Sequence, residues 1–255
     1  MDSICPKCEG TTWIVVNRGN VSAVEPCICR GEGIAGRMEP KALIPPLYRN
    51  VSLDNFLTRV NDPIAQRGLS GVMNQVAGFC RNYPDPDRPG LLLIGDPGTG
   101  KTHLAVAALR KILAKGYPCL FFDYQGLLDS IRAGYDPASN SANKETYRSA
   151  LDIDVLMIDD LGAHRVTDWV EDTITSIITH RCNSRKTLIA TTNLVMTETG
   201  ASAFGGPRIS GGSPMHLTTL GERIGLRACS RLMQMCTVIT MPRVEDYRVR
   251  TKRAL

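Results

Sequence analysis

A glycine-rich segment that ends in lysine and threonine carries the clearest chemistry in this sequence. Residues 91–102 contain the spacing Gly95-x-x-x-x-Gly100-Lys101-Thr102. Glycines let a backbone curl so that successive N–H groups point inward, and the positive end of a following helix completes an anion-binding nest. We expect Lys101 to reach the β- and γ-phosphates of a nucleotide and the Thr102 hydroxyl to ligate Mg²⁺. The segment therefore predicts a phosphate-binding loop.

The sequence on either side of the loop supports this interpretation. Residues 91–94 are apolar and predict a short buried strand, and residues 103–115 carry apolar residues at helical spacing. The alternative is a glycine-rich turn without a ligand, which would match the motif by chance in roughly one protein in a hundred. The residues that we expect to contact ATP are Gly95, Asp96, Pro97, Gly98, Thr99, Gly100, Lys101, Thr102 and His103.

Two acids follow a second apolar run at residues 155–158. If this run is a strand of a parallel sheet, its carboxyl end places Asp159 and Asp160 beside the phosphate loop. We expect Asp159 to hold Mg²⁺, directly or through water, and Asp160 to orient or deprotonate the attacking water. Without a phosphate loop upstream, the same pattern would indicate only a strand leaving the core.

A third apolar run, residues 187–192, ends in Asn193. An amide at this strand end can hold the attacking water or the γ-phosphate and so sense which nucleotide is bound; the alternative is an ordinary asparagine at the end of a strand. The sequence also predicts a strand at residues 118–123. Helices are predicted at residues 62–81 and 124–133, with a polar loop at residues 134–143.

Four of the nine cysteines form two close pairs near the N-terminus, and the sequence between the pairs resembles a hairpin. We expect a strand at residues 13–16 and a turn at residues 17–20. Two thiolate pairs joined in this way can close a four-cysteine tetrahedral zinc site, and the metal would stabilise a module too small to fold alone. The alternatives are a redox pair or free thiols. The expected Zn²⁺ ligands are Cys5, Cys8, Cys27 and Cys29.

Length and composition fit one medium domain with a small appendage. The chain has 255 residues, of which 43% are hydrophobic. Residues 1–7 contain no apolar segment of the kind found in a signal peptide, and no apolar run approaches the ~20 residues of a membrane span. We therefore expect a cytoplasmic protein with no membrane partner.

Several segments together resemble one family. The phosphate loop, the box at residues 159–162 and the Thr-Thr-Asn at residues 191–193 are similar to the phosphate loop, acidic box and first sensor of AAA+ ATPases. Residues 44–56, 230–236 and 245–248 resemble segments of the DnaC/IstB-like group, which contains replicative helicase loaders and transposition helper ATPases. The resemblance covers nearly the whole chain except residues 195–219.

The resemblance implies an α/β fold of the AAA+ P-loop NTPase type, with a parallel β-sheet flanked by helices and preceded by a small zinc-ribbon-like module. The expected organisation is a zinc-binding module at residues 1–36, a linker and adenine-side segment at residues 37–60, and the ATPase domain at residues 61–255. Little sequence follows residue 241, so a full helical lid is not expected. Arg243 or Arg248 would then replace the second sensor of such a lid.

The resemblance also implies that Arg231 is an arginine finger, which reaches the γ-phosphate of a neighbouring subunit with Arg227 as its support. A finger that acts in trans requires a homo-oligomer with ATP. Arg223, Arg227 and Arg231 recur every fourth residue, which predicts one helix face beside the apolar stripe of Leu220, Ile224, Ala228 and Leu232. The alternative is a solvated basic face.

The positive charge is concentrated near the C-terminus. Residues 220–255 hold eight Lys/Arg and three Asp/Glu, and this balance of +5 equals the net charge of the whole chain. A basic tail at residues 248–253 is typical of salt-sensitive contact with a phosphate backbone, although it can also be a solvated tail. The Gly- and Ser-rich residues 197–218 predict a flexible insertion, which is either a loop over the central channel of an oligomer or simply disordered.

These expectations converge on a Mg²⁺-dependent ATPase that loads a replicative helicase onto single-stranded DNA. Its expected cofactors are ATP, Mg²⁺ and Zn²⁺. A transposition helper ATPase shares every motif and remains an alternative. A second alternative is a nucleotide-gated DNA-binding adaptor with little hydrolysis, because many AAA+ proteins have Glu where this chain has Asp160. A small-molecule kinase is disfavoured, since nothing in the sequence supplies an acceptor site.

Overall fold

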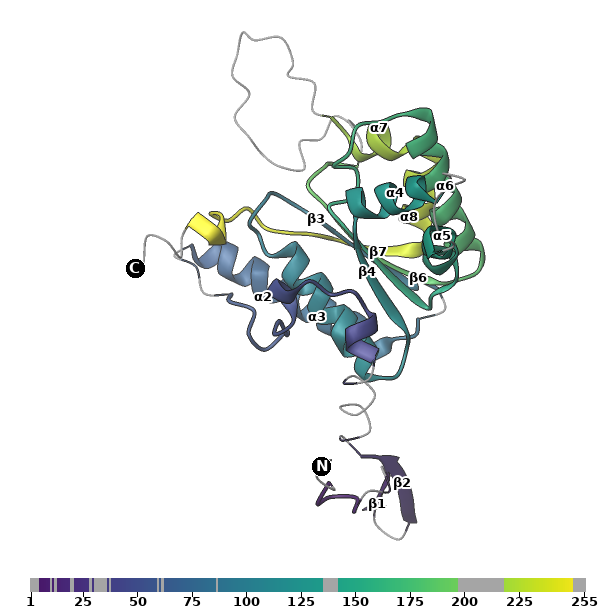
Figure 1. Cartoon of the computed structure of the whole chain (residues 1–255). Helices are drawn as coiled ribbons and strands as arrows, with labels where there is room; N and C mark the ends of the chain where they lie inside the picture. The colour runs from purple at the N-terminus through teal and green to yellow at the C-terminus, as the bar shows by residue number, and fades with distance from the viewer. Residues whose placement is uncertain are drawn as a thin grey trace.

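The computed structural model of this chain contains two separate β-sheets (Figure 1). It describes residues 5–9, 11, 13–18, 21–27, 29, 36, 38–58, 60, 62–85, 87–134, 142–196 and 218–249. The predicted insertion at residues 197–218, apart from its last residue, lies outside these ranges, as does most of the basic tail.

The larger sheet has five parallel strands in the order β4-β5-β6-β3-β7. The carboxyl ends of parallel strands meet at one edge of a sheet, so the loops after β3, β5 and β6 are neighbours there. The strands predicted at residues 91–94, 118–123, 155–158 and 187–192 are confirmed, whereas the strand at residues 236–240 is one that the sequence does not predict. The strands are β3 (Gly90–Ile94), β4 (Cys119–Asp123), β5 (Val155–Asp159), β6 (Thr187–Thr192) and β7 (Cys236–Thr240).

Helices cover both faces of this sheet (Figure 1). On one face lie α2 (Pro63–Asn82) and α3 (Lys101–Ala114). On the other face lie α4 (Tyr124–Ala133), α5 (Ala142–Asp152), α6 (Asp168–Asn183), α7 (Leu220–Ile224) and α8 (Leu226–Met235). Because both faces are covered, the central strands are apolar at successive positions and do not alternate with polar residues.

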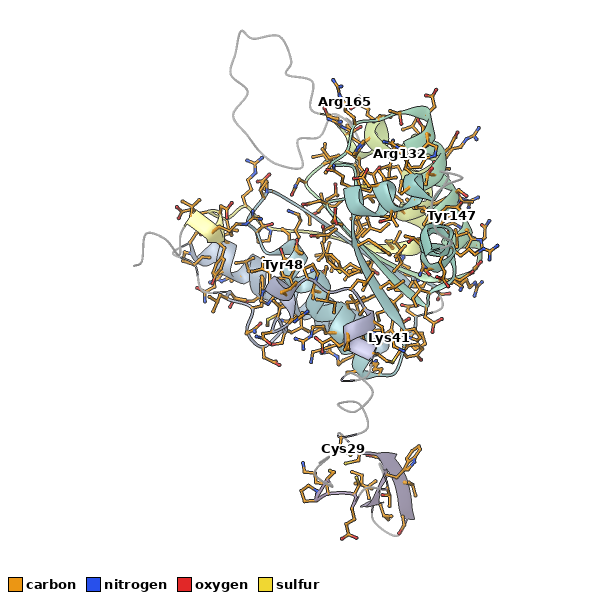
Figure 2. The ribbon with its side chains drawn as sticks, viewed as in Figure 1. Cys29, Lys41, Tyr48, Arg132, Tyr147 and Arg165 are labelled. Atoms are coloured by element: carbon orange, nitrogen blue, oxygen red, sulfur yellow. The ribbon has the colours of Figure 1, made fainter. Side chains whose placement is uncertain are left out.

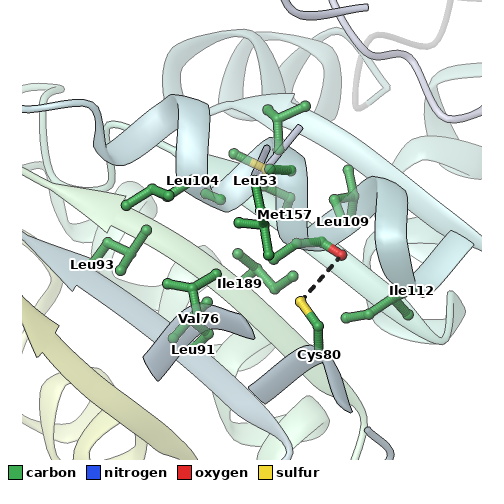
Figure 3. Packing of buried hydrophobic residues seen from close by; sticks show 14 of the residues in the cluster. Leu53, Val76, Cys80, Leu91, Leu93, Leu104, Leu109, Ile112, Met157 and Ile189 are labelled. Atoms are coloured by element: carbon green, nitrogen blue, oxygen red, sulfur yellow. Dashed lines mark hydrogen bonds between the residues drawn. The ribbon is translucent and has the colours of Figure 1, made fainter. Parts of the chain in front are cut away.

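Alternate residues of each strand enter one of two cores. Leu91 and Leu93 pack under α2 and α3, whereas Leu92 and Ile94 pack under the helices of the opposite face. Figure 3 shows the first core, in which Val76 of α2 and residues of α3 meet the strands. This packing on both sides fixes the position of β3 between the two layers of helices. It therefore also fixes the position of the loop that follows β3.

Helix α2 begins one residue after the predicted start because Asp62 is its N-cap. The Asp62 side chain accepts a hydrogen bond from the Ile64 N–H, and Pro63 occupies the first helical position. The polar loop predicted at residues 134–143 ends earlier than expected, since α5 begins at Ala142.

The prediction of one continuous helix face for Arg223, Arg227 and Arg231 is wrong. Gly225 has a positive φ of 84° and separates α7 from α8, so Arg223 lies on a different helix from the other two arginines. The chain bends here because glycine adopts this conformation without steric cost. The apolar stripe is nevertheless confirmed, because its members on both helices are fully buried.

The smaller sheet is an antiparallel pair formed by β1 (Trp13–Arg18) and β2 (Val21–Pro26). The hairpin prediction is confirmed, but the first strand is longer than expected. The first strand continues through residues 17 and 18, where the sequence indicates the start of the turn. Between the two sheets, the chain forms the short 3₁₀ helices η1 (Glu39–Lys41) and η2 (Pro46–Tyr48).

None of the helices in the described part of the chain combines the length and the hydropathy of a membrane span.

Candidate functional site

The loop between β3 and α3 has the backbone of an anion-binding nest. Gly98 and Gly100 adopt φ angles of 74° and 93°, which only glycine occupies freely. Helix α3 starts at Lys101, and no side chain caps its N-terminus. The first N–H groups of this helix are therefore available to an anion, so the loop fits the phosphates of a nucleotide.

Lys101 lies inside this loop and is 5% exposed. Its ammonium donates hydrogen bonds to the Gly95 carbonyl at 2.8 Å, the Asp96 carbonyl at 2.9 Å and Asn193 Oδ1 at 2.6 Å. Burial lowers the pKa of Lys101, and the nearby Asp160 carboxylate opposes this shift. The structure thus joins the phosphate loop to the residue that we expect to act as a sensor.

The acid box lies beside the loop. Thr102 Oγ1 donates to Asp159 Oδ1 at 2.9 Å, so the two expected Mg²⁺ ligands are in contact. Asp159 is 8% exposed. Burial raises the pKa of Asp159, and a hydrogen bond from Thr191 opposes that shift. A hydroxyl and a carboxylate oxygen are ligands that Mg²⁺ prefers, so these two residues fit the metal.

Asp160 occupies the next position and faces the Asn193 amide. Asn193 Nδ2 lies 3.4 Å from Asp160 Oδ1, while the oxygen of the same amide accepts from Lys101. The Asn193 side chain therefore bridges the phosphate loop and the acid that we expect to orient water.

Phe56, in the segment before α2, packs against Gly100 of the loop. A β-carbon added to Gly100 would lie 2.6 Å from the Phe56 ring. The Phe56 and His103 rings meet edge to face at 5.4 Å, and His103 Nε2 lies 2.9 Å from the Ser52 carbonyl oxygen. This contact brings residues of the expected adenine-side segment to the helix that follows the loop.

Residues 241–247 lie against the loop and the strand before it. The Met241 N–H donates to the Ile94 carbonyl at 2.7 Å, and the Tyr247 N–H donates to the Gly98 carbonyl at 3.2 Å. A β-carbon added to Gly98 would collide with the Asp246 carboxyl group. Two separate backbone hydrogen bonds thus tie residues 241–247 to the end of β3 and to the loop that follows it.

The expected arginine finger lies on α8, and its Nη1 donates to Gln234 at 2.7 Å. Arg227 lies on the exposed surface of the same helix. Arg223, on α7, donates to the His164 carbonyl at 3.4 Å. Of the two arginines proposed to replace a second sensor, Arg248 has its backbone N–H bonded to Asp246 at 2.8 Å.

The four N-terminal cysteines converge in the smaller module, where Figure 2 labels Cys29. Their sulfur atoms all lie within 4.8 Å of one another. The Cys5–Cys27 and Cys8–Cys29 sulfurs are 3.8 and 3.3 Å apart, far beyond the ~2.05 Å of a disulfide. A tetrahedral zinc with Zn–S bonds of ~2.3 Å would separate its sulfurs by about 3.8 Å. These residues therefore fit a structural zinc ion.

Sequence reasoning missed several residues at the nucleotide site. The sequence indicates Thr191 only as part of a family motif, and Phe56 only within a similar segment. Asp246 lies far along the chain from the loop that it contacts, so no local pattern indicates the contact. Thr191 meets the acid box because β5 and β6 are neighbours in the sheet, and a local sequence pattern does not give the order of the strands.

The sheet order, the loop and the acid box together define an AAA+ P-loop nucleoside triphosphatase. The fold-class prediction is therefore confirmed.

Comparisons with known proteins identify the family. The model of a family described as IstB-like ATP binding protein matches residues 86–211. A crystal structure of the DnaC helicase loader is 30% identical to this chain with a TM-score of 0.61; the match covers 78% of this chain and all of that chain. The chain belongs to the DnaC/IstB-like family of ATP-binding proteins, as its motifs predicted.

Two curated relatives illustrate the range of the family. The replicative helicase loader DnaC of Escherichia coli strain K12 is 26% identical over 155 residues, which are 61% of this chain and 60% of DnaC. The phage-like element PBSX protein XkdC of Bacillus subtilis strain 168 is 25% identical over 199 residues, which are 75% of this chain and 72% of XkdC.

Proposed function

We propose that this chain hydrolyses ATP and uses the nucleotide cycle to load a replicative helicase onto single-stranded DNA. The observation that carries the loader part is the similarity to the DnaC structure, which this chain matches over the whole of that chain at 30% identity. The contacts of Lys101, Thr102, Asp159 and Asn193 support the hydrolytic part.

In this proposal, the phosphate-loop N–H groups and Lys101 bind the β- and γ-phosphates. The Lys101 ammonium, which donates to Asn193 and two loop carbonyls, turns to the phosphate oxygens when ATP enters. Thr102 and Asp159 would hold Mg²⁺, whose charge offsets the negative charge that develops on the phosphates during transfer. Asp160 then orients or deprotonates the attacking water, with Asn193 fixing its carboxylate.

Asp160 has a shorter side chain than the Glu found at this position in many AAA+ proteins. We therefore expect slow turnover that a partner or DNA accelerates. Arg231 of a neighbouring subunit would supply positive charge to the γ-phosphate and so link hydrolysis to assembly. Its position on the surface of α8, where it bonds Gln234, is compatible with a role in trans.

Two surfaces would serve the partners. The basic C-terminal residues would contact the DNA backbone, so binding to single-stranded DNA should weaken steeply as salt rises. The cysteine module would dock the helicase. A DNA affinity that does not change with salt would contradict the assignment of the C-terminal residues to DNA binding.

The experiment that tests the loader proposal is affinity purification of an Asp160→Asn variant with ATP present. This change should trap the assembled state by slowing hydrolysis. Recovery of a replicative helicase with the variant, and much less with Lys101→Ala, supports loading. Recovery of a transposase without a helicase would overturn the loader proposal and leave the nucleotide site intact.

The transposition helper remains the second candidate because the matching family is described as IstB-like. An adaptor that scarcely hydrolyses ATP is the third, and Asp160 is the residue that favours it. Turnover that single-stranded DNA stimulates and that Lys101→Ala abolishes would exclude the adaptor.

A further inference from the structure

Thr191 lies at the carboxyl end of β6 and is fully buried. It is hydrogen-bonded to the acid box at residues 159–161. Its hydroxyl donates to Asp159 Oδ1 at 2.6 Å and accepts from the Asp160 N–H at 2.9 Å. Its carbonyl accepts from the Leu161 N–H at 2.8 Å. One residue of β6 is therefore hydrogen-bonded to three successive residues at and after the end of β5.

The direction of the Thr191 proton follows from these partners. A hydroxyl has one proton, and the Asp160 N–H occupies one of its acceptor sites, so the proton goes to the Asp159 carboxylate. The Thr102 hydroxyl donates to the same oxygen, Oδ1. Neither of these two bonds involves Asp159 Oδ2. The two threonines thus hold the Asp159 carboxyl group in one orientation from two sides.

Asp160 has a backbone conformation that needs support. Its φ of 54° lies in the left-handed region, which residues with a β-carbon adopt at a cost. Thr191 bonds the N–H groups of Asp160 and of the following residue, which fixes the backbone on both sides of that conformation. In this conformation the Asp160 carboxylate lies 3.4 Å from Asn193 Nδ2.

We propose that Thr191 is a positioning residue for both acids: it orients Asp159 toward Mg²⁺ and holds Asp160 in the conformation that places its carboxylate beside Asn193. This inference rests on the proposed ATP hydrolysis and extends it to a residue that touches neither nucleotide nor metal. The hydroxyl is the group that acts, because it makes the bond to Asp159 and one of the two bonds that hold Asp160.

The test compares Thr191→Val with the wild-type chain. Valine keeps the shape of threonine and removes the hydroxyl. The affinity of a fluorescent ATP analogue is measured with Mg²⁺ and with EDTA, and kcat and KM are measured for ATP. Loss of a hydrogen bond to a charged group predicts that the gain in affinity from Mg²⁺ and the kcat each fall about tenfold. The affinity in EDTA should change by less than about twofold, because the phosphate loop is untouched.

Two further variants separate positioning from packing. Thr191→Ser keeps the hydroxyl, so it should restore most of the Mg²⁺-dependent gain and of kcat. Thr187→Val removes a buried hydroxyl at the opposite end of the same strand, where it bonds Tyr83 at 3.2 Å. Thr187→Val should lower the melting temperature as Thr191→Val does, yet keep the full Mg²⁺-dependent gain.

A Thr191→Val protein whose affinity gain from Mg²⁺ and whose kcat both equal those of the wild type would overturn this inference. The proposed function would remain standing. A folded Thr191→Ser protein that loses the affinity gain from Mg²⁺ would also overturn this inference, since that result would assign the effect to the methyl group. If the wild-type chain itself shows no gain from Mg²⁺ and no turnover, the proposed function fails, and this inference fails with it.

Discussion

The Lys101 side chain shows how one residue connects the parts of the nucleotide site. Its three hydrogen bonds reach two carbonyls of its own loop and the amide of Asn193. These acceptors stabilise a buried ammonium whose pKa burial lowers. A bound phosphate would offer the same ammonium a better, charged acceptor.

Replacing Lys101 by alanine should therefore weaken ATP binding by about 100-fold, which corresponds to the loss of one or two hydrogen bonds to charged oxygens. The melting temperature should not fall, because the change also removes a desolvated charge. Nucleotide titration and thermal unfolding measure the two effects. Lys111→Ala, an exposed lysine on the same helix, is the matched control. An unchanged ATP affinity in Lys101→Ala would contradict the assignment of the loop.

Gly98 is constrained by its conformation and by its neighbour. An alanine there would adopt a left-handed φ at a cost of about 1–2 kcal/mol, and its β-carbon would collide with the Asp246 carboxyl group. We expect Gly98→Ala to lower both stability and ATP affinity. Gly71→Ala on α2, where a β-carbon meets nothing within 4 Å, should instead raise stability by about 0.5–1 kcal/mol. Denaturant unfolding and nucleotide titration distinguish these outcomes, and a Gly98→Ala protein as stable as the wild type would contradict the collision.

Among the elements, α6 is joined to the sheet by a buried arginine. Arg181 has no exposed surface, and its guanidinium donates to the carbonyls of Ala150, Leu151, Asp154 and Thr187. These carbonyls belong to the end of α5, the turn before β5 and the start of β6. Burial lowers the pKa of Arg181 to about 10, so the group remains charged at neutral pH.

Arg181→Met should destabilise the fold by about 2–4 kcal/mol, because four carbonyls lose a charged donor and at least some remain buried without a partner. Arg148→Met, an exposed arginine on α5, should change stability by less than about 0.5 kcal/mol. Urea unfolding of the two variants measures the difference. Equal stability of both would show that water or a rearranged backbone satisfies these carbonyls.

The helices on this face of the sheet also contact one another through side chains. Tyr147 of α5 lies 2.9 Å from the Ser176 hydroxyl of α6, and the Arg132 guanidinium of α4 lies 4.6 Å from the centre of the Trp169 ring. Figure 2 labels Tyr147 and Arg132 on this face of the sheet. These contacts hold α4, α5 and α6 as a unit, and α6 in turn packs on α8, which carries Arg231.

At the scale of the whole molecule, the two sheets depend on different sources of stability. The five-stranded sheet has a core on each face. The two-stranded sheet exposes Trp13, Val15 and Val24, so it has little apolar burial of its own. A bound metal ion would supply the stability that the small apolar core of this module lacks.

We therefore expect the purified protein to contain about one zinc per chain. Removal of the metal by a strong chelator, or by Cys8→Ser, should unfold the small module while ATP binding persists. Metal analysis, limited proteolysis and nucleotide titration measure these effects. Cys80→Ser, a cysteine of the main core, is the control that should keep zinc while lowering stability. A wild-type protein that carries no metal when prepared without chelator would contradict the zinc site.

The sequence by itself determined most of the elements and predicted the local chemistry. The phosphate loop, the acid box and Asn193 were predicted from residue types and spacing, because each occupies the end of an apolar run and is encoded within a few consecutive residues. The zinc ligands were predicted in the same way. The sequence also determined the family, since several separate motifs occur in one order.

Only the tertiary structure decided which of these residues meet. The contact of Asp246 with Gly98 and the hydrogen bonds of Thr191 to the acid box join segments that are far apart in the chain, and no local periodicity encodes them. The break at Gly225 depended on a backbone conformation that the helical spacing of the arginines concealed. Packing on both faces of the sheet sets these distances, and it is a property of the whole fold.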